Sequence, residues 1–248
     1  MNSRLPKDLC HVTVLSYNHC NMLNWIKEKI PEAVHVKPLT REASQRSFFR
    51  LEIDGNEYVL MFYPDSNPVE IARISHFTKL YLQAGIHVPK IYKVIDDQAL
   101  LLEDLGRHYF QFYFKRSLVA DQKKMIEQLI RIGLAISAIP AAETPLVHDL
   151  ARQRYEMDFF IDHYFSSQVR QEKKEEIKSH LYRLVDETCA PTVFAHRDYH
   201  SRNILVSNGR YGVVDFQDSM LSHPLYDLAS LLWDAYLPWT ESLRVDIV

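Results

Sequence analysis

Alternating apolar and polar residues mark two strand pairs in the first hundred residues. Phe48–Ile53 and Glu57–Tyr63 are rich in aromatic and aliphatic residues, and Asp54–Asn56 between them has the composition of a hairpin turn. Ile91–Ile95 and Ala99–Leu102, joined by a short polar turn, form a second pair. The pattern predicts two antiparallel hairpins.

Between these hairpins the apolar spacing changes to three or four residues, which is typical of a helix with one buried face. Asn67 is a suitable N-cap, Pro68 suits the first helical position, and Gly85 suits the C-terminal stop. We therefore expect a helix over Pro68–Ala84. Its buried face would consist of Ile71, Ile74, Phe77, Leu80 and Tyr81.

Helical spacing dominates after Gly106. Three helices are predicted, over Asp121–Ala138, Asp149–Phe165 and Glu172–Thr188, with Asp121 and Asp149 as caps of the first two. The strand-rich part and the helical part predict an α+β protein with two lobes.

We expect the lobes to span residues 1–103 and 104–248, joined at Glu103–Gly106.

Glycine is scarce in this chain. There are 6 glycines in 248 residues, against roughly 17 at the average usage of about 7%. Their positions spell neither the dinucleotide-binding pattern G-x-G-x-x-G nor the P-loop pattern. A nucleotide phosphate would therefore be bound without these glycine loops.

Charge and composition narrow the class of partner. The net charge is −3 and no dense basic stripe occurs, so we expect no nucleic acid partner. No apolar run reaches the ~20 residues that span a bilayer, and the start lacks a signal-peptide pattern, so we expect no membrane association. The 3 cysteines are widely spaced and fit a reducing compartment, so we expect a cytoplasmic protein.

The segment Thr192–Asp218 contains most of the candidate functional residues. A polar loop with Asp198 and Asn203 precedes a predicted hairpin, and Asp215 follows its second strand. Two carboxylates and an amide oxygen at one end of a hairpin are hard ligands that suit Mg²⁺. This arrangement indicates phosphoryl transfer, with Asp198 as base, Asn203 and Asp215 on the metal, and Arg202 near the phosphate.

Asp198, Asn203 and Arg202 also have a simpler interpretation. Asp198 and Asn203 could bond their own loop backbone, and Arg202 could form a surface ion pair. Asp218, three residues after Asp215, could simply cap a turn.

Two neighbouring residues have predicted structural roles. We expect His196 to be a packed structural histidine. Asp227 would hold the backbone of the loop that carries Asp198.

Two motifs in this segment resemble those of kinases. His196-Arg197-Asp198, followed after four residues by Asn203, resembles the kinase catalytic loop, and Asp215–Gln217 resembles the metal-binding triplet. Together with Pro224–Leu232, they make the chain similar to the aminoglycoside phosphotransferase and choline kinase-like family. The resemblance implies a bilobal protein kinase-like fold that uses ATP and Mg²⁺, with a small antiparallel-sheet N-terminal lobe and a mostly helical C-terminal lobe.

Three further segments resemble one subgroup of that family, namely Arg41–Arg50, Leu100–Gly106 and Asp215–Ser219. This subgroup comprises bacterial kinases that phosphorylate the anomeric hydroxyl of N-acetylmuramate and N-acetylglucosamine in cell-wall recycling. The resemblance implies a sugar acceptor, with His200 lining the acceptor pocket and Asp218 contacting a sugar hydroxyl. We also expect a monomer.

The resemblance also assigns nucleotide contacts. Ser44 and Arg46 stand where kinases carry a glycine-rich loop and would touch phosphates, with a solvated turn as the alternative. Glu103 and Leu105 lie in the joint that would bind adenine through its backbone.

The chain departs from the family pattern in two ways. Tyr58–Phe62 contains no lysine where kinases bind the α- and β-phosphates, and the chain ends at Val248, so we expect a shortened helical lobe. Two alternatives follow. One is a different acceptor, such as choline, an aminoglycoside or another amino alcohol. The other is a catalytically inactive, pseudokinase-like binding module or fragment.

Overall fold

The computed structural model describes residues 21–39, 46–165, 169–238, 240 and 244. Two compact units divide the chain. Within the described residues, the first comprises those up to Ala72 together with Lys90–Asp104, and the second comprises Arg73–Pro89 and those from Leu105 onward. The lobe boundary expected between residues 103 and 104 stays a prediction.

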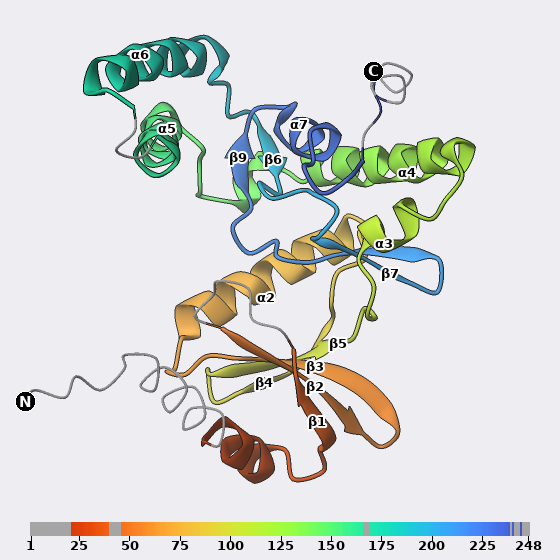
Figure 1. Ribbon diagram of the computed structural model, residues 1–248. Helices are drawn as coiled ribbons and strands as arrows, with labels where there is room; N and C mark the ends of the chain where they lie inside the picture. Colours follow the sequence, from red (N-terminus) through yellow and green to blue (C-terminus); the bar gives the residue numbers. More distant parts are fainter. Residues whose placement is uncertain (1–20, 40–45, 166–168, 239, 241–243, 245–248) are drawn as a thin grey trace, which may run out of the picture. The chain divides into compact units, whose positions relative to one another are not determined.

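The first unit contains a five-stranded antiparallel sheet (Figure 1). Its strands, in spatial order, are β1 (Val34–Pro38), β2 (Ser47–Ile53), β3 (Asn56–Phe62), β5 (Ala99–Glu103) and β4 (Ile91–Ile95). Both expected hairpins, β2–β3 and β4–β5, are confirmed. Strand β1 and a helical segment at residues 21–29 were not predicted. No residue of β1 is buried, so it carries little alternation to detect.

The β2–β3 turn follows from its two central residues. Ile53 pairs with Asn56, which leaves Asp54 and Gly55 as a two-residue loop with φ of +50° and +76°. Positive φ at both positions defines the hairpin turn whose twist matches that of the strands. Gly55 adopts this conformation without a Cβ clash, and aspartate tolerates it.

Helix α2 (Pro68–Gln83) begins in the first unit and continues in the second. The Asn67 side chain accepts a hydrogen bond from the Glu70 N–H at 3.3 Å, and Gly85 has a φ of +75° just beyond the helix. All five apolar residues expected on its inner face are buried. The predicted helix, its N-cap and its C-terminal glycine are confirmed.

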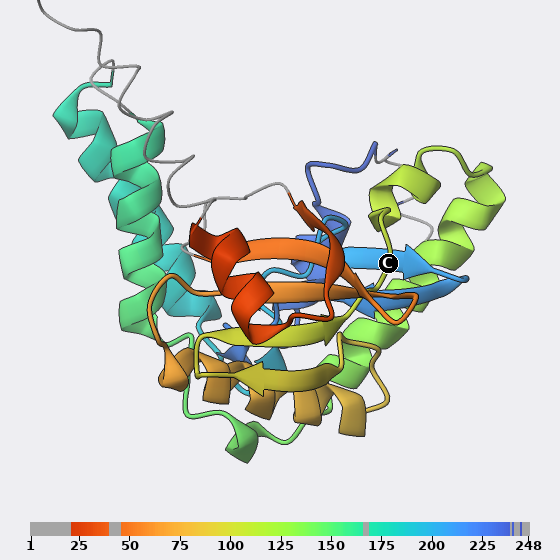
Figure 2. The same cartoon turned by 90° about the horizontal axis from the view of Figure 1, so that it is seen from below.

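The second unit contains five helices besides part of α2, a short 3₁₀ turn and two small antiparallel strand pairs within the described residues. Figure 2 shows the two helices α5 and α6 side by side. The helices are α3 (Phe110–Phe114), α4 (Val119–Ser137), α5 (Leu150–Tyr164), α6 (Gln171–Thr188) and α7 (Tyr226–Leu232). The strands are β6 (Val193–Ala195) paired with β9 (Met220–Ser222), and β7 (Ile204–Ser207) paired with β8 (Arg210–Val213).

The two expected helix caps have different outcomes. The Asp149 side chain accepts a hydrogen bond from the Arg152 N–H at 2.9 Å, which confirms it as the N-cap of α5. The expected cap at Asp121 is wrong, because α4 begins at Val119 with Leu118 in the capping position. Asp121 instead lies in the first helical turn, where a negative charge still stabilises the helix N-terminus.

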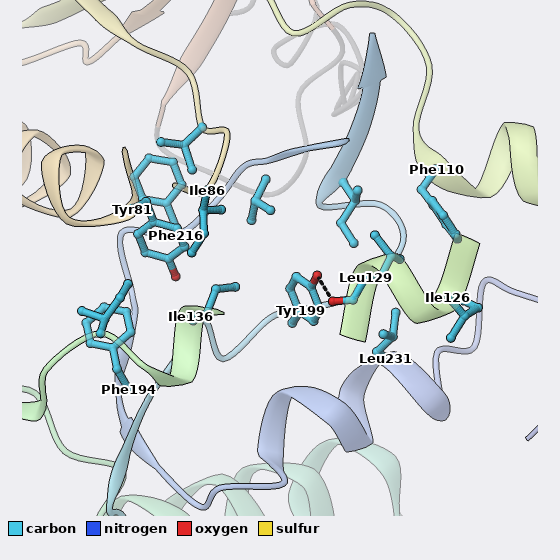
Figure 3. Close-up of a cluster of buried hydrophobic side chains, with 14 of the residues drawn as sticks. Tyr81, Ile86, Phe110, Ile126, Leu129, Ile136, Phe194, Tyr199, Phe216 and Leu231 are labelled. Atoms are coloured by element: carbon cyan, nitrogen blue, oxygen red, sulfur yellow. Dashed lines mark hydrogen bonds between the residues drawn. The ribbon is translucent and has the colours of Figure 1, made fainter. Parts of the chain in front are cut away.

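A cluster of aromatic and aliphatic side chains forms the core of the second unit. Tyr81 from α2 packs against Phe216 and Phe194, with ring centroids 5.0 and 5.9 Å apart, respectively (Figure 3). The Tyr199 hydroxyl, on the loop between β6 and β7, donates to the Leu129 carbonyl of α4 at 2.8 Å. This loop is therefore built into the hydrophobic core. An antiparallel sheet in one unit and a mostly helical second unit confirm the α+β class.

In the part of the chain that the structure describes, no helix has both the length and the apolar surface needed to cross a bilayer.

Candidate active site

The loop between β6 and β7 is held by a buried carboxylate. Asp227, at the start of α7, accepts hydrogen bonds from the His196 N–H at 2.7 Å and the Arg197 N–H at 3.0 Å. Burial raises the pKa of Asp227, although His196 and Arg197 oppose that shift. These two hydrogen bonds confirm that Asp227 holds the loop backbone. They also support Arg197 in the left-handed backbone region, at a φ of +80°.

A second buried carboxylate, Asp234, holds the other end of the same loop. It accepts hydrogen bonds from the Ser201 N–H and the Tyr236 N–H, both at 2.7 Å. Sequence reasoning missed Asp234, because a single acidic residue after α7 gives no signal of which backbone groups it will meet. The loop is thus fixed at both ends and, through Tyr199, in its middle.

His196 links the loop to the end of β8. Its Nδ1 accepts a hydrogen bond from the Asp198 N–H at 3.2 Å, so the ring proton lies on Nε2 and is donated to the Val214 carbonyl at 3.0 Å. The ring is fully buried, and burial lowers its pKa, which favours this neutral form. The expected structural role of His196 is confirmed.

Asp198 presents a pre-oriented carboxylate. Its Oδ1 lies 3.0 Å from His200 Nε2, and its Oδ2 accepts a hydrogen bond from Asn203 Nδ2 at 2.8 Å. His200 Nδ1 accepts from the Arg202 N–H at 3.2 Å, so Nε2 carries the proton that faces Asp198. The hydrogen bond from His200 lowers the pKa of Asp198 despite partial burial. The side chain is 57% exposed, so an ionised oxygen remains accessible to a substrate.

Asn203 and Asp215 lie at the same end of the β7–β8 hairpin. Ile204 pairs with Val213, and the Val214 N–H donates to the Asn203 carbonyl at 2.9 Å, so Val214 lies opposite Asn203 and Asp215 is the next residue in the chain. Asn203 uses its amide hydrogens on Asp198, which leaves the amide oxygen as the atom that would face a cation. Carboxylate and amide oxygens are the donors that Mg²⁺ prefers. The residues present therefore fit this ion.

Asp215 is oriented by a side chain that the sequence did not single out. Its backbone has a φ of +65°, and its Oδ1 accepts a hydrogen bond from Gln217 Nε2 at 2.8 Å. Gln217 also lies 3.3 Å from Asp218 Oδ2, and Arg73 of α2 lies 3.3 Å from Asp218 Oδ1. Asp218 is thus paired with an arginine, and its expected contact with a sugar hydroxyl stays a prediction.

The remaining candidates are placed as follows. The Arg202 guanidinium lies 3.8 Å from the centre of the Tyr236 ring, which orients it beside the loop. In the first unit, Arg46 lies 5.9 Å from the Phe48 ring, and Glu103 ends β5. Leu105 is buried in the second unit. Ser44 lies outside the described residues. Phosphate contacts by Arg202, Arg46 and Ser44 and adenine binding at Glu103 and Leu105 stay predictions.

Known structures show which fold this is. Aminoglycoside 2′-phosphotransferase-IIIa in its GDP complex matches with a TM-score of 0.70, over 92% of this chain and 81% of that one, at 14% identity. An ADP-bound aminoglycoside phosphotransferase, APH(2″)-Ib, matches with a TM-score of 0.68, over 92% and 80%, also at 14% identity. The likeness confirms the expected protein kinase-like fold.

Similar sequences narrow the family. The N-acetylmuramate/N-acetylglucosamine kinase of Pseudomonas aeruginosa is 32% identical over 213 residues, which cover 82% of this chain and 61% of that protein. The protein of the same name from Neisseria meningitidis is 26% identical over 237 residues, or 91% of this chain and 69% of that protein. The match thus spans about three fifths of the P. aeruginosa relative's length.

The family itself is shown by a match over most of the chain. The family model for the phosphotransferase enzymes matches residues 35–248, which include the loop with Asp198 and the hairpin that ends at Asp215. With the relatives and the fold described above, this match shows that the chain belongs to the phosphotransferase enzyme family.

Proposed function

We propose that this chain is an ATP- and Mg²⁺-dependent kinase that phosphorylates an amino sugar. The observation that carries the proposal is the ionised, exposed Asp198, fixed by His200 and Asn203 at the end of the hairpin that bears Asp215. The named relatives favour the anomeric hydroxyl of N-acetylmuramate or N-acetylglucosamine as acceptor. The protein would act as a cytoplasmic monomer in cell-wall recycling.

Asp198 acts as the general base in this reaction. A carboxylate oxygen has two lone-pair sites, so the one bonded to His200 or Asn203 still accepts a substrate hydroxyl. As the acceptor oxygen forms its bond to the γ-phosphorus, the bond from phosphorus to the bridging oxygen of ADP breaks. The hydroxyl proton passes to Asp198.

Asn203 and Asp215 would hold Mg²⁺, which, when bound, neutralises charge on the triphosphate. Two protein ligands leave the other positions of an octahedral ion to water and phosphate oxygens, as is usual for Mg²⁺ in nucleotide sites. Arg202, oriented on Tyr236, would add positive charge near the transferred group.

The test is ATP turnover by the purified chain across a panel of acceptors. ADP release is followed with N-acetylmuramate, N-acetylglucosamine, glucosamine, choline and kanamycin. Loss of the reducing end identifies anomeric phosphorylation, because a phosphate on the anomeric oxygen blocks ring opening. We expect turnover with the N-acetylated sugars and a matching loss of reducing ends.

Two variants control this assay. Asp198→Asn removes the base and should lower kcat about 10²- to 10⁴-fold while ATP still binds. Asp162→Asn makes the same change at an exposed position of α5 and should leave kcat unchanged. Turnover with choline or kanamycin alone would reassign the acceptor. The absence of turnover with every acceptor would favour a binding module and reject the proposal.

A further inference from the structure

The side chain of Arg197, which directly precedes Asp198, contacts two residues from outside the loop between β6 and β7. Its Nη2 donates to Glu156 Oε1 at 2.6 Å, and its Nη1 lies 2.7 Å from His148 Nε2. His148 Nε2 also lies 3.0 Å from Glu156 Oε2, which closes a triangle of three polar side chains. The Tyr226 ring covers the guanidinium, with its centroid 4.8 Å from Cζ.

This triangle is itself fixed to the fold. His148 is buried, its Nδ1 lies 3.1 Å from Ser222 Oγ on β9, and its backbone N–H donates to the Leu221 carbonyl at 2.8 Å. Gln153 of α5 donates to the His148 carbonyl at 2.7 Å. Glu156 lies one turn further along the same helix. The residues that contact Arg197 are therefore themselves held by β9 and α5.

Charge complementarity favours the same arrangement. Burial alone would raise the pKa of Glu156, but the hydrogen bond from His148 and the charge of Arg197 outweigh it and lower that pKa. The carboxylate is thus ionised opposite the guanidinium. The Glu156 carboxylate is bonded by two nitrogens, Arg197 Nη2 and His148 Nε2. This gives the ion pair a defined geometry, which an isolated surface ion pair lacks.

Arg197 directly precedes Asp198, so contacts that restrain Arg197 also restrain the position of Asp198. The left-handed backbone of Arg197, at a φ of +80°, is strained in a residue other than glycine. Asp227 accepts a hydrogen bond from the backbone N–H of Arg197, whereas Glu156 accepts one from its guanidinium and is itself oriented by His148. Both ends of the strained residue are therefore restrained.

We propose that Glu156, oriented by His148, is a positioning residue, which holds the catalytic base in place through the guanidinium of Arg197. The proposal rests on the function proposed above. A pocket of about 350 Å³ borders Glu156, His148 and Tyr226. Water from this pocket can fill the space left by a shortened Glu156 side chain, so the fold should tolerate the substitution.

Kinetics separate positioning from binding. Glu156→Ala should lower kcat about 10- to 100-fold, since a small misplacement of a catalytic group has an effect of this size. The KM values for ATP and the sugar should stay close to those of the wild type, because Glu156 touches neither substrate in the proposed mechanism. Glu156→Gln keeps an oxygen that can accept from Arg197 and should recover part of the lost kcat.

Two further variants test the route through Arg197. The double variant Glu156→Ala/Arg197→Ala should be no slower than Arg197→Ala alone, because both changes break the same interaction. Asp186→Asn is the matched control. It breaks the 2.6 Å ion pair with Arg154 that joins α6 to α5, but it does not touch Arg197, so kcat should not change. Wild-type kcat in Glu156→Ala, multiplied losses in the double variant, or equal losses in Asp186→Asn would each overturn the proposal.

Hydrogen exchange gives a readout that does not depend on turnover. Amides of residues 196–203 should exchange faster in Glu156→Ala than in the wild type or in Asp186→Asn. Equal exchange in Glu156→Ala and the wild type would refute the positioning role. If the wild type phosphorylates no acceptor, the proposed function fails, and the exchange data still decide whether Glu156 holds this loop.

Discussion

Asp227 offers a sharp test of how the loop that carries Asp198 is held. Asp227→Asn keeps the size of the side chain but replaces one of its two acceptor oxygens with an NH₂ group. One of the two backbone N–H groups, of His196 or Arg197, then loses its acceptor and faces a donor. The side chain is only 8% exposed, so water cannot easily replace the lost bond.

The expected loss follows from the hydrogen-bond energies. A buried donor left without an acceptor costs about 1–3 kcal/mol. We therefore expect the free energy of unfolding at pH 7 to fall by about 2 kcal/mol, which for a chain of this size lowers Tm by about 4–8 °C. Urea unfolding followed by circular dichroism measures this change, with exposed Asp162→Asn as the control. A change below about 0.5 kcal/mol, no larger than that of an ordinary surface substitution, would refute the reasoning.

The pH dependence adds an independent check. The pKa of Asp227 is raised by burial, so between the ordinary pKa of about 4 and the raised value the folded protein binds a proton more tightly than the unfolded chain. This group therefore makes the wild type lose stability as pH rises through that window. The Asp227→Asn variant has no titrating group at this position, so the stability gap between variant and wild type should narrow as pH rises. A gap that widens would contradict the sign.

Three other predictions concern the base, the core and the first hairpin. His200→Ala removes the hydrogen bond that lowers the pKa of Asp198, so the acidic limb of the kcat/KM profile should move to higher pH; an unmoved limb would show that His200 does not tune the base. Tyr199→Phe removes the buried bond to the Leu129 carbonyl and should cost about 1 kcal/mol in urea unfolding, whereas an unchanged midpoint would mean that the carbonyl finds another donor. Gly55→Ala forces a Cβ into a φ of +76° and should cost about 1 kcal/mol by the same measurement; a stability gain would contradict the turn geometry.

Several features of this protein could be predicted from local sequence. The β2–β3 hairpin, α2 with its Asn67 cap and buried face, and the α5 cap at Asp149 depend on residues close together in the chain, and the structure confirms all of them. The placement of Asp198, Asn203 and Asp215 also depends on residues close together in the chain. Asp198 and Asn203 share one loop, and the hairpin that follows places Asp215 at the same end as Asn203.

Local patterns were insufficient where the signal was weak or the stabilising contacts came from elsewhere. Strand β1 has no buried residue, so its sequence shows no alternation of buried and exposed positions. Helix α4 begins at Val119, before Asp121, and the Leu118 side chain in the capping position makes no hydrogen bond.

The loop between β6 and β7 likewise depends partly on local sequence and partly on distant residues. The sequence determined that Asp198 and Asn203 share one loop and that Asp215 lies at the same end of the next hairpin, because chain connectivity and strand pairing alone place them there. Tertiary structure decided what holds them there, namely the carboxylates of Glu156 and Asp234, which lie 41 and 33 residues from their partners Arg197 and Ser201. A carboxylate stabilises whichever donors the fold presents to it, and those donors exist as neighbours only after the chain has folded.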